Sequence, residues 1–142
     1  MILVDVNLLL YAYNASTREH HRATRWLEDV FSRPETVGLA WETVLAFLRV
    51  GTDPRIQSKP LRLDEAVTVV DGWLARSNVT LVNATSQHWG VMAKLLPESR
   101  VRGSLIMDAH LAALAIEHGA TLCTNDRDFA RFPGLRVEYP LQ

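Results

Sequence analysis

Cysteine is almost absent from this chain of 142 residues. The one cysteine, Cys123, excludes an internal disulfide and lies in an apolar run, which indicates buried packing and not a reactive thiolate. Long apolar runs are absent too. None approaches the roughly 18 residues of a membrane span, and no basic segment followed by an apolar stretch opens the chain. These absences predict a cytoplasmic protein that does not enter a membrane.

An excess of charge of either sign is lacking as well, because the formal net charge is only −1. A protein that binds nucleic acid over its whole surface would be strongly basic, so this class of nucleic-acid-binding protein is excluded. Among the 15 basic residues only Lys59 and Lys94 are lysine. The remaining arginines suit bidentate phosphate contacts, although a GC-rich coding bias explains their excess equally well.

Three common enzyme motifs are missing. The chain holds no G-x-x-x-x-G-K-[ST], no G-x-G-x-x-G and no G-x-S-x-G, which argues against P-loop, dinucleotide-binding and serine-hydrolase sites. It does hold 48% hydrophobic and 22% charged residues, the proportions of a folded domain. Its length suits one domain with a full core, and no linker or repeat divides residues 1–142.

Short apolar runs alternate with segments of helical periodicity. The runs predict strands at Ile2–Asp5, Val37–Trp41, Val79–Val82, Thr121–Thr124 and Arg136–Tyr139. The periodic segments predict helices at Asn7–Tyr13, His20–Phe31, Glu42–Val50, Leu63–Ala75, His88–Leu96 and Leu105–His118, with a short one at Arg127–Phe132. Thr85 is expected to cap the fifth helix, Pro97 to end it, and Gly119 to follow the sixth. This alternation predicts a single α/β domain whose central parallel sheet of four or five strands carries helices on both faces.

Four acidic residues interrupt or follow the apolar segments. Asp5, Glu42 and Asp126 come at or after the ends of predicted strands, and Asp108 stands alone inside an apolar helix. Because the carboxyl ends of parallel strands lie along one edge of a sheet, the acids are expected to gather there. Carboxylates that lie so close together repel one another unless a cation neutralises them. The pattern therefore predicts a divalent-metal site.

Helix capping is the structural alternative for these acids. Asp5 and Asp126 each precede a predicted helix and suit the capping position, so capping and metal binding are both open for them. Glu42 is a poorer cap. Asp108 lies one turn inside its helix, where a buried acid needs a cation or several donors, and no lysine or arginine lies within a helical turn of it.

Ligands that are all oxygen indicate a hard cation, Mg²⁺ or Mn²⁺. Zinc would bring histidine or cysteine ligands at suitable spacing. His20 and His21 are adjacent and cannot share one helix face. His110, two residues after Asp108, is expected to point away from it as a packing or surface residue.

The motifs that carry these acids resemble a known family. Asp5-Val6-Asn7 after the first strand, the helix Leu105–Gly119 and the run Thr124-Asn125-Asp126-Arg127-Asp128-Phe129 are similar to PIN-domain ribonucleases. The likeness is strongest to the VapC toxins of type II toxin–antitoxin systems, and Arg131-Phe132-Pro133-Gly134-Leu135 resembles their mycobacterial branch. It covers essentially the whole chain, although residues 54–96 carry no family motif.

The resemblance implies an endoribonuclease that uses Mg²⁺ or Mn²⁺, leaves a 5′-phosphate and a 3′-hydroxyl, and so inhibits translation and growth. The family's catalytic and metal-binding acids fall on Asp5, Glu42, Asp108 and Asp126. Asn7 and Thr124 match polar positions that orient these acids. Asp128 matches a fifth acid, which is either a further ligand or the cap of the short helix.

Arginines are the candidates for holding the phosphates of such a substrate. Arg100 and Arg102, in the turn before the Asp108 helix, come first, and Arg18, Arg22 and Arg25 come next. For each of them a solvated surface charge is the structural alternative.

The resemblance also implies a homodimer, a cognate VapB-type antitoxin and an RNA substrate. That RNA is tRNA or the sarcin–ricin loop of ribosomal RNA, and no residue chooses between them. A phosphatase of the haloacid-dehalogenase type is a rival, but it needs D-x-D, and Asn7 occupies the second position. A phosphate-accepting receiver domain needs a lysine after a late strand, which Lys59 and Lys94 do not supply. A non-catalytic RNA- or protein-binding PIN module would lack one or more of the four acids.

Overall fold

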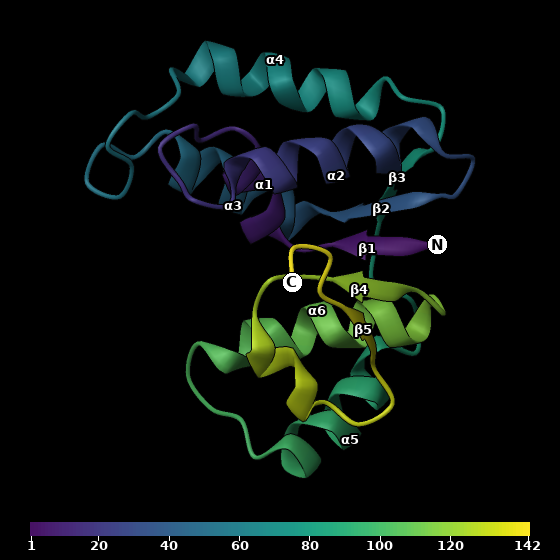
Figure 1. Cartoon of the computed structure of the whole chain (residues 1–142). Coiled ribbons are helices and arrows are strands. Elements are labelled where there is room, and N and C mark those ends of the chain that lie inside the picture. Colours follow the sequence, from purple (N-terminus) through teal and green to yellow (C-terminus); the bar gives the residue numbers. More distant parts are fainter.

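Five parallel strands form the centre of the molecule. The computed structural model describes all 142 residues, and its strands are β1 (Ile2–Val4), β2 (Val37–Ala40), β3 (Val79–Val82), β4 (Thr121–Cys123) and β5 (Arg136–Glu138). They lie in the order β3-β2-β1-β4-β5, each parallel to its neighbours (Figure 1). Ile2 pairs with Val37 on one side and with Thr121 on the other, so the first strand of the chain is the central one.

Helices cover both faces of this sheet. They are α1 (Val6–Ala12), α2 (His20–Ser32), α3 (Trp41–Gly51), α4 (Leu63–Leu74), α5 (His88–Ser99) and α6 (Leu105–Glu117), with the 3₁₀ helix η1 (Arg127–Arg131) near the end. The helices α1 to α4 lie on one side of the sheet, and α5 and α6 lie on the other (Figure 1). The predicted α/β fold with a parallel sheet of four or five strands is confirmed, and the sheet has five.

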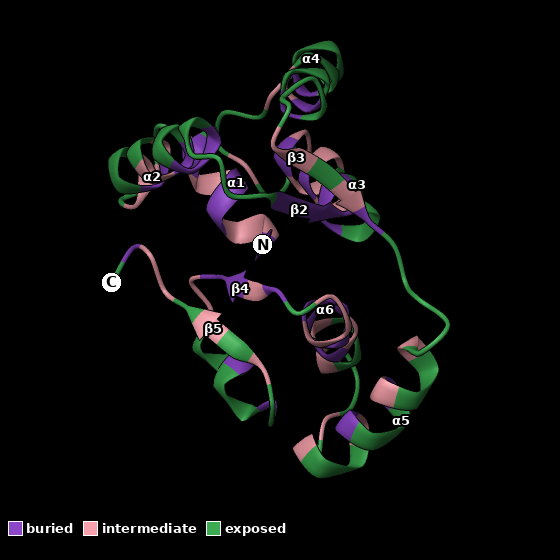
Figure 2. Cartoon of the chain, turned by 90° about the vertical axis from the view of Figure 1, so that its right-hand side faces the viewer, coloured by how far each residue is buried: buried purple, intermediate pink, exposed green.

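Side chains that alternate along β1 divide the core in two. Ile2 and Val4 belong to a cluster of 18 buried residues that extends into α1 to α4. Leu3 points to the opposite face and joins a cluster of 15 that extends into α5 and α6. Figure 2 shows buried residues on the strands and on the inward sides of the helices. Full burial of one such side chain stabilises the fold by roughly 1.5–3 kcal/mol.

Cys123 at the end of β4 is part of the first cluster. Burial raises the pKa of its thiol to about 12. A thiol with so high a pKa does not form the nucleophilic thiolate at neutral pH, so this residue packs and does not react, as the sequence predicts.

Two expectations about α5 are wrong. Pro97 does not end the helix, which continues to Ser99 and stops at Arg100, a residue in the left-handed region with φ of 54°. The fixed φ of proline is compatible with a helix. Pro97 therefore removes one backbone hydrogen bond but does not end the helix. Thr85 does not cap the helix either: Gln87 precedes it, and the Thr85 hydroxyl accepts a hydrogen bond from the Gln87 N–H (3.1 Å).

Other element boundaries agree with the prediction to within a few residues. The strand predicted to reach Trp41 ends at Ala40, and Trp41 opens α3. Gly119 follows α6 with φ of 64°, the left-handed conformation that a glycine after a helix supplies at least cost.

The carboxyl ends of the strands meet at one edge of the sheet, on the left in Figure 1. There β1 runs into α1, β2 runs into α3, and β4 leads through a short turn to η1. The predicted acids Asp5, Glu42 and Asp126 lie at these three junctions. No helix of the structure combines the length and the apolar character that crossing a membrane requires.

Candidate active site

Asp5 ends β1 and caps α1. Its Oδ1 accepts a hydrogen bond from the Val6 N–H (2.7 Å). Its Oδ2 accepts one from the Thr124 hydroxyl (2.7 Å) and one from the Asn7 side-chain amide (3.1 Å). The residue is only 9% exposed. Asp5 therefore caps α1, which was one of the two roles open to it from the sequence. Its carboxylate is also bound by Thr124, the residue after β4.

The hydrogen bonds to Asp5 do not compensate for its burial. Desolvation raises the pKa of this carboxyl above its ordinary value, although the Thr124 hydroxyl, the Val6 N–H and the Asn7 amide act in the opposite direction. The carboxylate of Asp126 adds repulsion. The net rise despite three donors shows that burial outweighs these hydrogen bonds at Asp5.

Thr124, which is fully buried after β4, links two of the acids. Its hydroxyl donates to Asp5 and accepts from the Asp126 backbone N–H (3.0 Å). The amide of Asn7 donates to the same hydroxyl (3.3 Å), and its carbonyl accepts from the Asn125 N–H (3.2 Å). The start of α1 and the turn after β4 are therefore joined by side chains at the positions predicted to orient the acids.

Asp126 is the residue that caps η1. Its Oδ1 accepts a hydrogen bond from the Asp128 N–H (2.9 Å). Asp128 lies in the first turn of η1, with its carboxylate 3.7 Å from the guanidinium of Arg131. The capping alternative considered for Asp128 is therefore wrong, because Asp126 fills that position.

Asp108 lies in the first turn of α6, and the other acids act on it across the sheet edge. Its pKa is raised to about 6, first by desolvation and then by repulsion from Asp5, Asp126 and Asp128. Arg131 partly offsets this rise. Three aspartates from the ends of β1 and β4 and from α6 thus share one electrostatic environment, in which negative charge predominates.

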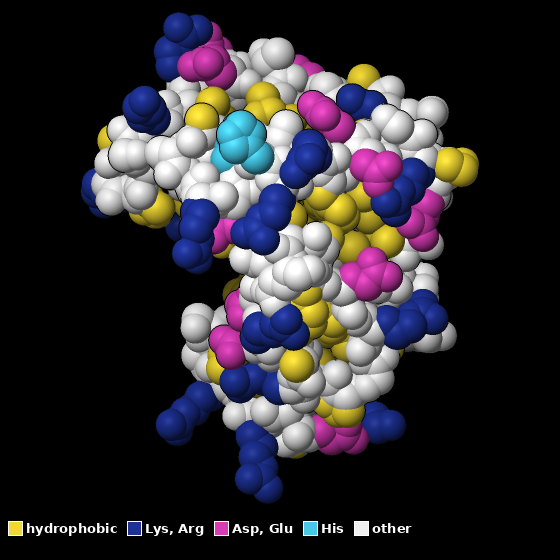
Figure 3. Space-filling model, viewed as in Figure 1, with side chains coloured by type: hydrophobic (Ala, Val, Ile, Leu, Met, Phe, Trp, Pro, Cys, Tyr) yellow, Lys and Arg dark blue, Asp and Glu magenta, His cyan; other side chains and the backbone are white.

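Glu42, in the first turn of α3, faces the same cavity from its other side. That cavity has a volume of about 750 Å³, and Asp5, Glu42 and Asp108 all line it. Figure 3 shows a hollow on the left edge of the molecule, with acidic and basic side chains on its rims. No three Asp, Glu, His or Cys side chains converge closely enough to hold a cation as they stand. Cation binding therefore requires side-chain rotation.

His110 is the residue that the sequence reading most misjudged. It lines the same cavity, and its Nε2 lies 3.0 Å from Glu42 Oε1. The two atoms are in contact but are not aligned as a hydrogen bond, which leaves Nε2 without a hydrogen-bonding partner. The i, i+2 spacing within α6 says nothing of α3, which supplies the neighbour of His110.

Arg49 was not singled out from the sequence either. It lies on the same helix as Glu42 and is the one arginine or lysine that lines the acidic cavity. Seven residues separate the two side chains, which is about two helical turns and places both on one face. That spacing is the sequence signal that would have found Arg49.

The predicted phosphate-binding arginines lie away from the cavity lining. Arg100 and Arg102 are exposed in the turn between α5 and α6, at the end of α6 that carries Asp108. Arg18 and Arg25 are exposed as well, and Arg22 donates to the Leu141 carbonyl (2.6 Å). The structure thus ties Arg22 to the end of the chain and places Arg18 3.9 Å from Glu19, whereas Arg25, Arg100 and Arg102 make no ion pair.

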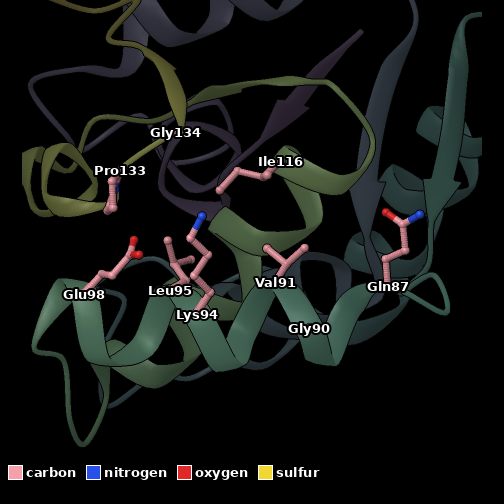
Figure 4. A pocket seen from close by; sticks show the side chains of 9 residues that line it. All are labelled: Gln87, Gly90, Val91, Lys94, Leu95, Glu98, Ile116, Pro133 and Gly134. Atoms are coloured by element: carbon pink, nitrogen blue, oxygen red, sulfur yellow. The ribbon is translucent and has the colours of Figure 1, made fainter.

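A second cavity, of about 530 Å³, lies between α5 and the turn before β5 (Figure 4). Its only charged lining residues are Lys94 and Glu98. Apolar side chains and glycines make up most of the remaining surface, and no group of titratable side chains converges there. The acidic cavity and not this one is the candidate site, because only the acidic cavity concentrates groups capable of chemistry.

Comparison with known proteins decides the family. The PIN domain model matches residues 2–135 of the chain. The chain belongs to the PIN-domain family. This PIN domain is 41% identical to the ribonuclease VapC37 of Mycobacterium tuberculosis over 99% of its own length and 97% of that protein. It is 36% identical to ribonuclease VapC33 of the same species, over 100% and 99% of the two chains.

Solved structures agree on the fold of this PIN domain. VapBC2 of Rickettsia felis, bound to a DNA fragment from its promoter, superposes with a TM-score of 0.70 at 24% identity, over 97% of this chain and 98% of that one. VapC20 of Mycobacterium tuberculosis, a toxin that cleaves the sarcin–ricin loop, superposes with a TM-score of 0.67 at 19% identity, over 96% and 99%.

Proposed function

We propose that this PIN domain is a metal-dependent endoribonuclease, the toxin of a type II toxin–antitoxin pair, which cleaves RNA in the cytoplasm and so inhibits translation and growth. One observation carries the proposal: Asp5 and Asp108 line one cavity at the carboxyl edge of the sheet, and Thr124 links Asp5 to Asp126 there. The likeness to proteins named ribonucleases supports RNA as the substrate.

The residues at this edge fit a divalent cation with oxygen ligands, Mg²⁺ or Mn²⁺. Asp5, Asp108 and Asp126 would hold it, joined by Glu42 once that side chain turns from His110. When bound, such an ion lowers the pKa of a coordinated water and neutralises charge on the phosphate that is attacked. Asp128 adds negative charge at the same place and supports cation binding without being needed as a ligand.

The chain's own groups hold two of the acids, Asp5 and Asp126, in position, so the rotation falls to Glu42 and Asp108. The Val6 N–H and the Thr124 hydroxyl fix both oxygens of Asp5, and the Asp128 N–H fixes one oxygen of Asp126. Fixed carboxylates have little conformational freedom left to lose when a ligand binds. Around them, the exposed Arg100, Arg102, Arg18 and Arg25 are the candidates for contacts to more distant phosphates, and the substrate is tRNA or ribosomal RNA.

The apolar rim of the cavity supports a protein partner. Leu45, Leu63 and Met107 line the cavity and are each more than half exposed, at 58%, 63% and 56%. Trp41 lies on the same helix as Leu45 and is 46% exposed. Large apolar side chains exposed around an active-site cavity suit coverage by a cognate VapB-type antitoxin or a second subunit. A light-scattering mass of twice 16.0 kDa for the isolated protein would identify the homodimer.

The proposed function is tested by cleavage of structured RNA. Wild-type protein is incubated with tRNA and with ribosomes in Mg²⁺ or Mn²⁺, and new 5′-phosphate ends are mapped. We expect cleavage that EDTA abolishes and that Asp5→Asn lowers by at least about a hundredfold, as removal of one electrostatic group from an active site does. Asp71→Asn, an exposed change on α4, is the matched control. Cleavage that persists in EDTA or in Asp5→Asn would disprove the metal mechanism, and a wild type that cleaves neither RNA indicates a non-catalytic module.

Arg49 supplies a separate prediction about substrate binding. Because its side chain is the one cationic group in the acidic cavity, we expect Arg49→Ala to raise the KM for RNA about tenfold, equivalent to one charge-assisted hydrogen bond. The affinity for Mn²⁺ should not fall, since a cation is removed. Arg76→Ala, after the end of α4, where the guanidinium lies over the Phe31 ring and outside the acidic cavity, is the control. An unchanged KM would exclude Arg49 from the substrate contacts.

A further inference from the structure

A row of four side chains leads from the interior of the second core cluster to Glu42. Its first member is Glu117 at the end of α6, whose side chain is fully buried. Glu117 Oε2 lies 2.7 Å from His88 Nδ1, His88 Nε2 lies 2.8 Å from His110 Nδ1, and His110 Nε2 lies 3.0 Å from Glu42 Oε1. The two imidazole rings meet edge to face at 83°.

The buried end of this row is held firmly. Glu117 Oε1 accepts a hydrogen bond from the Thr85 backbone N–H (2.8 Å), so both of its oxygens are engaged. Glu117 and His110 lie seven residues apart on one face of α6, and His88 comes from the first turn of α5. Two packed helices therefore fix the first three members, and the row reaches the acidic cavity at His110 and Glu42.

Each contact of the row constrains the next one. A carboxylate only accepts hydrogen bonds, so the Glu117 contact takes the Nδ1–H of His88. His88 Nε2 and His110 Nδ1 face each other at 2.8 Å, where one nitrogen donates and the other accepts. The placement of His110, whose Nε2 contacts Glu42, therefore depends on Glu117 and His88.

We propose that Glu117, His88 and His110 are positioning residues that set where the Glu42 carboxylate stands relative to the three aspartates. The proposal rests on the proposed metal-dependent function, because Glu42 is the acid that must turn to join the others. Buried groups that orient a ligand side chain alter metal affinity or activity about 10- to 100-fold when they are replaced. None of the three positioning residues needs to touch metal or RNA.

The test begins in the metal-free protein, with the histidine ¹⁵N signals. Glu117→Gln keeps the shape and the Thr85 contact, but its amide donates to His88 Nδ1 where the carboxylate accepted. His88 then donates through Nε2 to His110 Nδ1, so the hydrogen positions change in both rings. We expect the signals of both histidines to shift. An unchanged His110, two contacts from the mutation, would overturn the proposal.

Mn²⁺ affinity, measured by electron paramagnetic resonance, gives the second readout. We expect Glu117→Gln and His110→Asn each to change the Kd about tenfold. In a Glu42→Gln background, Glu117→Gln should have no further effect, because these residues act only through Glu42. His118→Asn is the matched control, since this neighbouring histidine contacts only the Asn83 carbonyl. An equal change in both backgrounds, or none in the wild-type background, would overturn the positioning role.

The two proposals fail in different ways. If the wild type binds no Mn²⁺ and cleaves no RNA, the proposed function is wrong and the positioning role falls with it, whatever the histidine signals show. If the wild type binds Mn²⁺ and cleaves RNA but Glu117→Gln behaves like His118→Asn, the function stands and only the positioning role is wrong. His110→Asn, at the open end of the row, preserves the test if the buried Glu117 tolerates no substitution.

Discussion

Asp108→Asn is expected to abolish RNA cleavage and, at the same time, to stabilise the metal-free protein above pH 6. The loss of activity follows from the position of Asp108 among Asp5, Asp126 and Asp128, where its charge is part of the proposed cation site. We expect the cleavage rate to fall by at least about a hundredfold. A mutation that only disrupted folding would lower both the cleavage rate and the free energy of unfolding. A lower rate together with a higher stability therefore identifies the effect of the Asp108 charge.

The stabilisation follows from the raised pKa of Asp108, about 6 in the folded protein against an ordinary value of 3.8. Between these two pH values the folded state binds more protons than the unfolded state. Stability therefore falls as pH rises through this interval. Above the folded pKa the full destabilisation is present, and below the unfolded pKa it is absent.

The size of this effect is reduced by solvent. A difference between 3.8 and about 6 corresponds to roughly 3 kcal/mol for a fully shielded group. Asp108 is only partly buried, so screening lowers the expected gain of Asp108→Asn to about 1–2 kcal/mol. Urea unfolding in EDTA should show this gain at pH 8 and none below pH 4. Equal stabilities at pH 8, or a difference that grows as pH falls, would contradict the electrostatic origin.

Metal should reverse the order of the two proteins. A ligand that binds only the folded state adds about 2.7 kcal/mol at a concentration 100 times its Kd. The wild type should gain this stability from Mn²⁺ and overtake Asp108→Asn, which binds the ion weakly. If both proteins gain equally, Asp108 does not hold the cation.

The sequence predicts that these acids lie at one edge of the sheet because the parallel direction of the strands is enough to place their carboxyl ends together. Asp5 and Asp126 follow β1 and β4, which pair in parallel, so their junctions must lie near each other. Asp108 is found by a different signal, a lone charge in the apolar helix α6. These inferences need only the local chain and the parallel sheet.

Contacts between separate helices are what the sequence cannot supply. The approach of His110 to Glu42 depends on how α3 and α6 face each other across the acidic cavity, and that of His88 to Glu117 depends on the packing of α5 against α6. No periodicity within one helix contains this information. The same limit explains Pro97. A single proline in the sequence predicts a helix end, whereas α5 continues to Ser99 and is followed by Arg100, whose φ lies in the left-handed region.

Thr124 is the residue whose replacement should damage fold and site together. Its hydroxyl is fully buried, donates to Asp5 and accepts from the Asp126 N–H and the Asn7 amide. Thr124→Val keeps the volume and removes all three contacts. The Asp126 backbone N–H would then lack its partner and the buried Asp5 carboxylate would lose one of its three donors, at a cost of about 2–4 kcal/mol in the free energy of unfolding.

The pH dependence of Mn²⁺ binding should distinguish the loss of the Thr124 hydroxyl from a general loss of packing. The Thr124 hydroxyl lowers the pKa of Asp5, so its removal raises that pKa further. Asp5 then holds its proton to higher pH, and Mn²⁺ binding, which needs the carboxylate, should require a more alkaline solution in Thr124→Val than in the wild type. Thr124→Ser, which keeps the hydroxyl and loses only a methyl group, is the control. It should restore the wild-type pH dependence of Mn²⁺ binding even where it does not restore full stability, because the hydroxyl and not the methyl group governs the charge on Asp5.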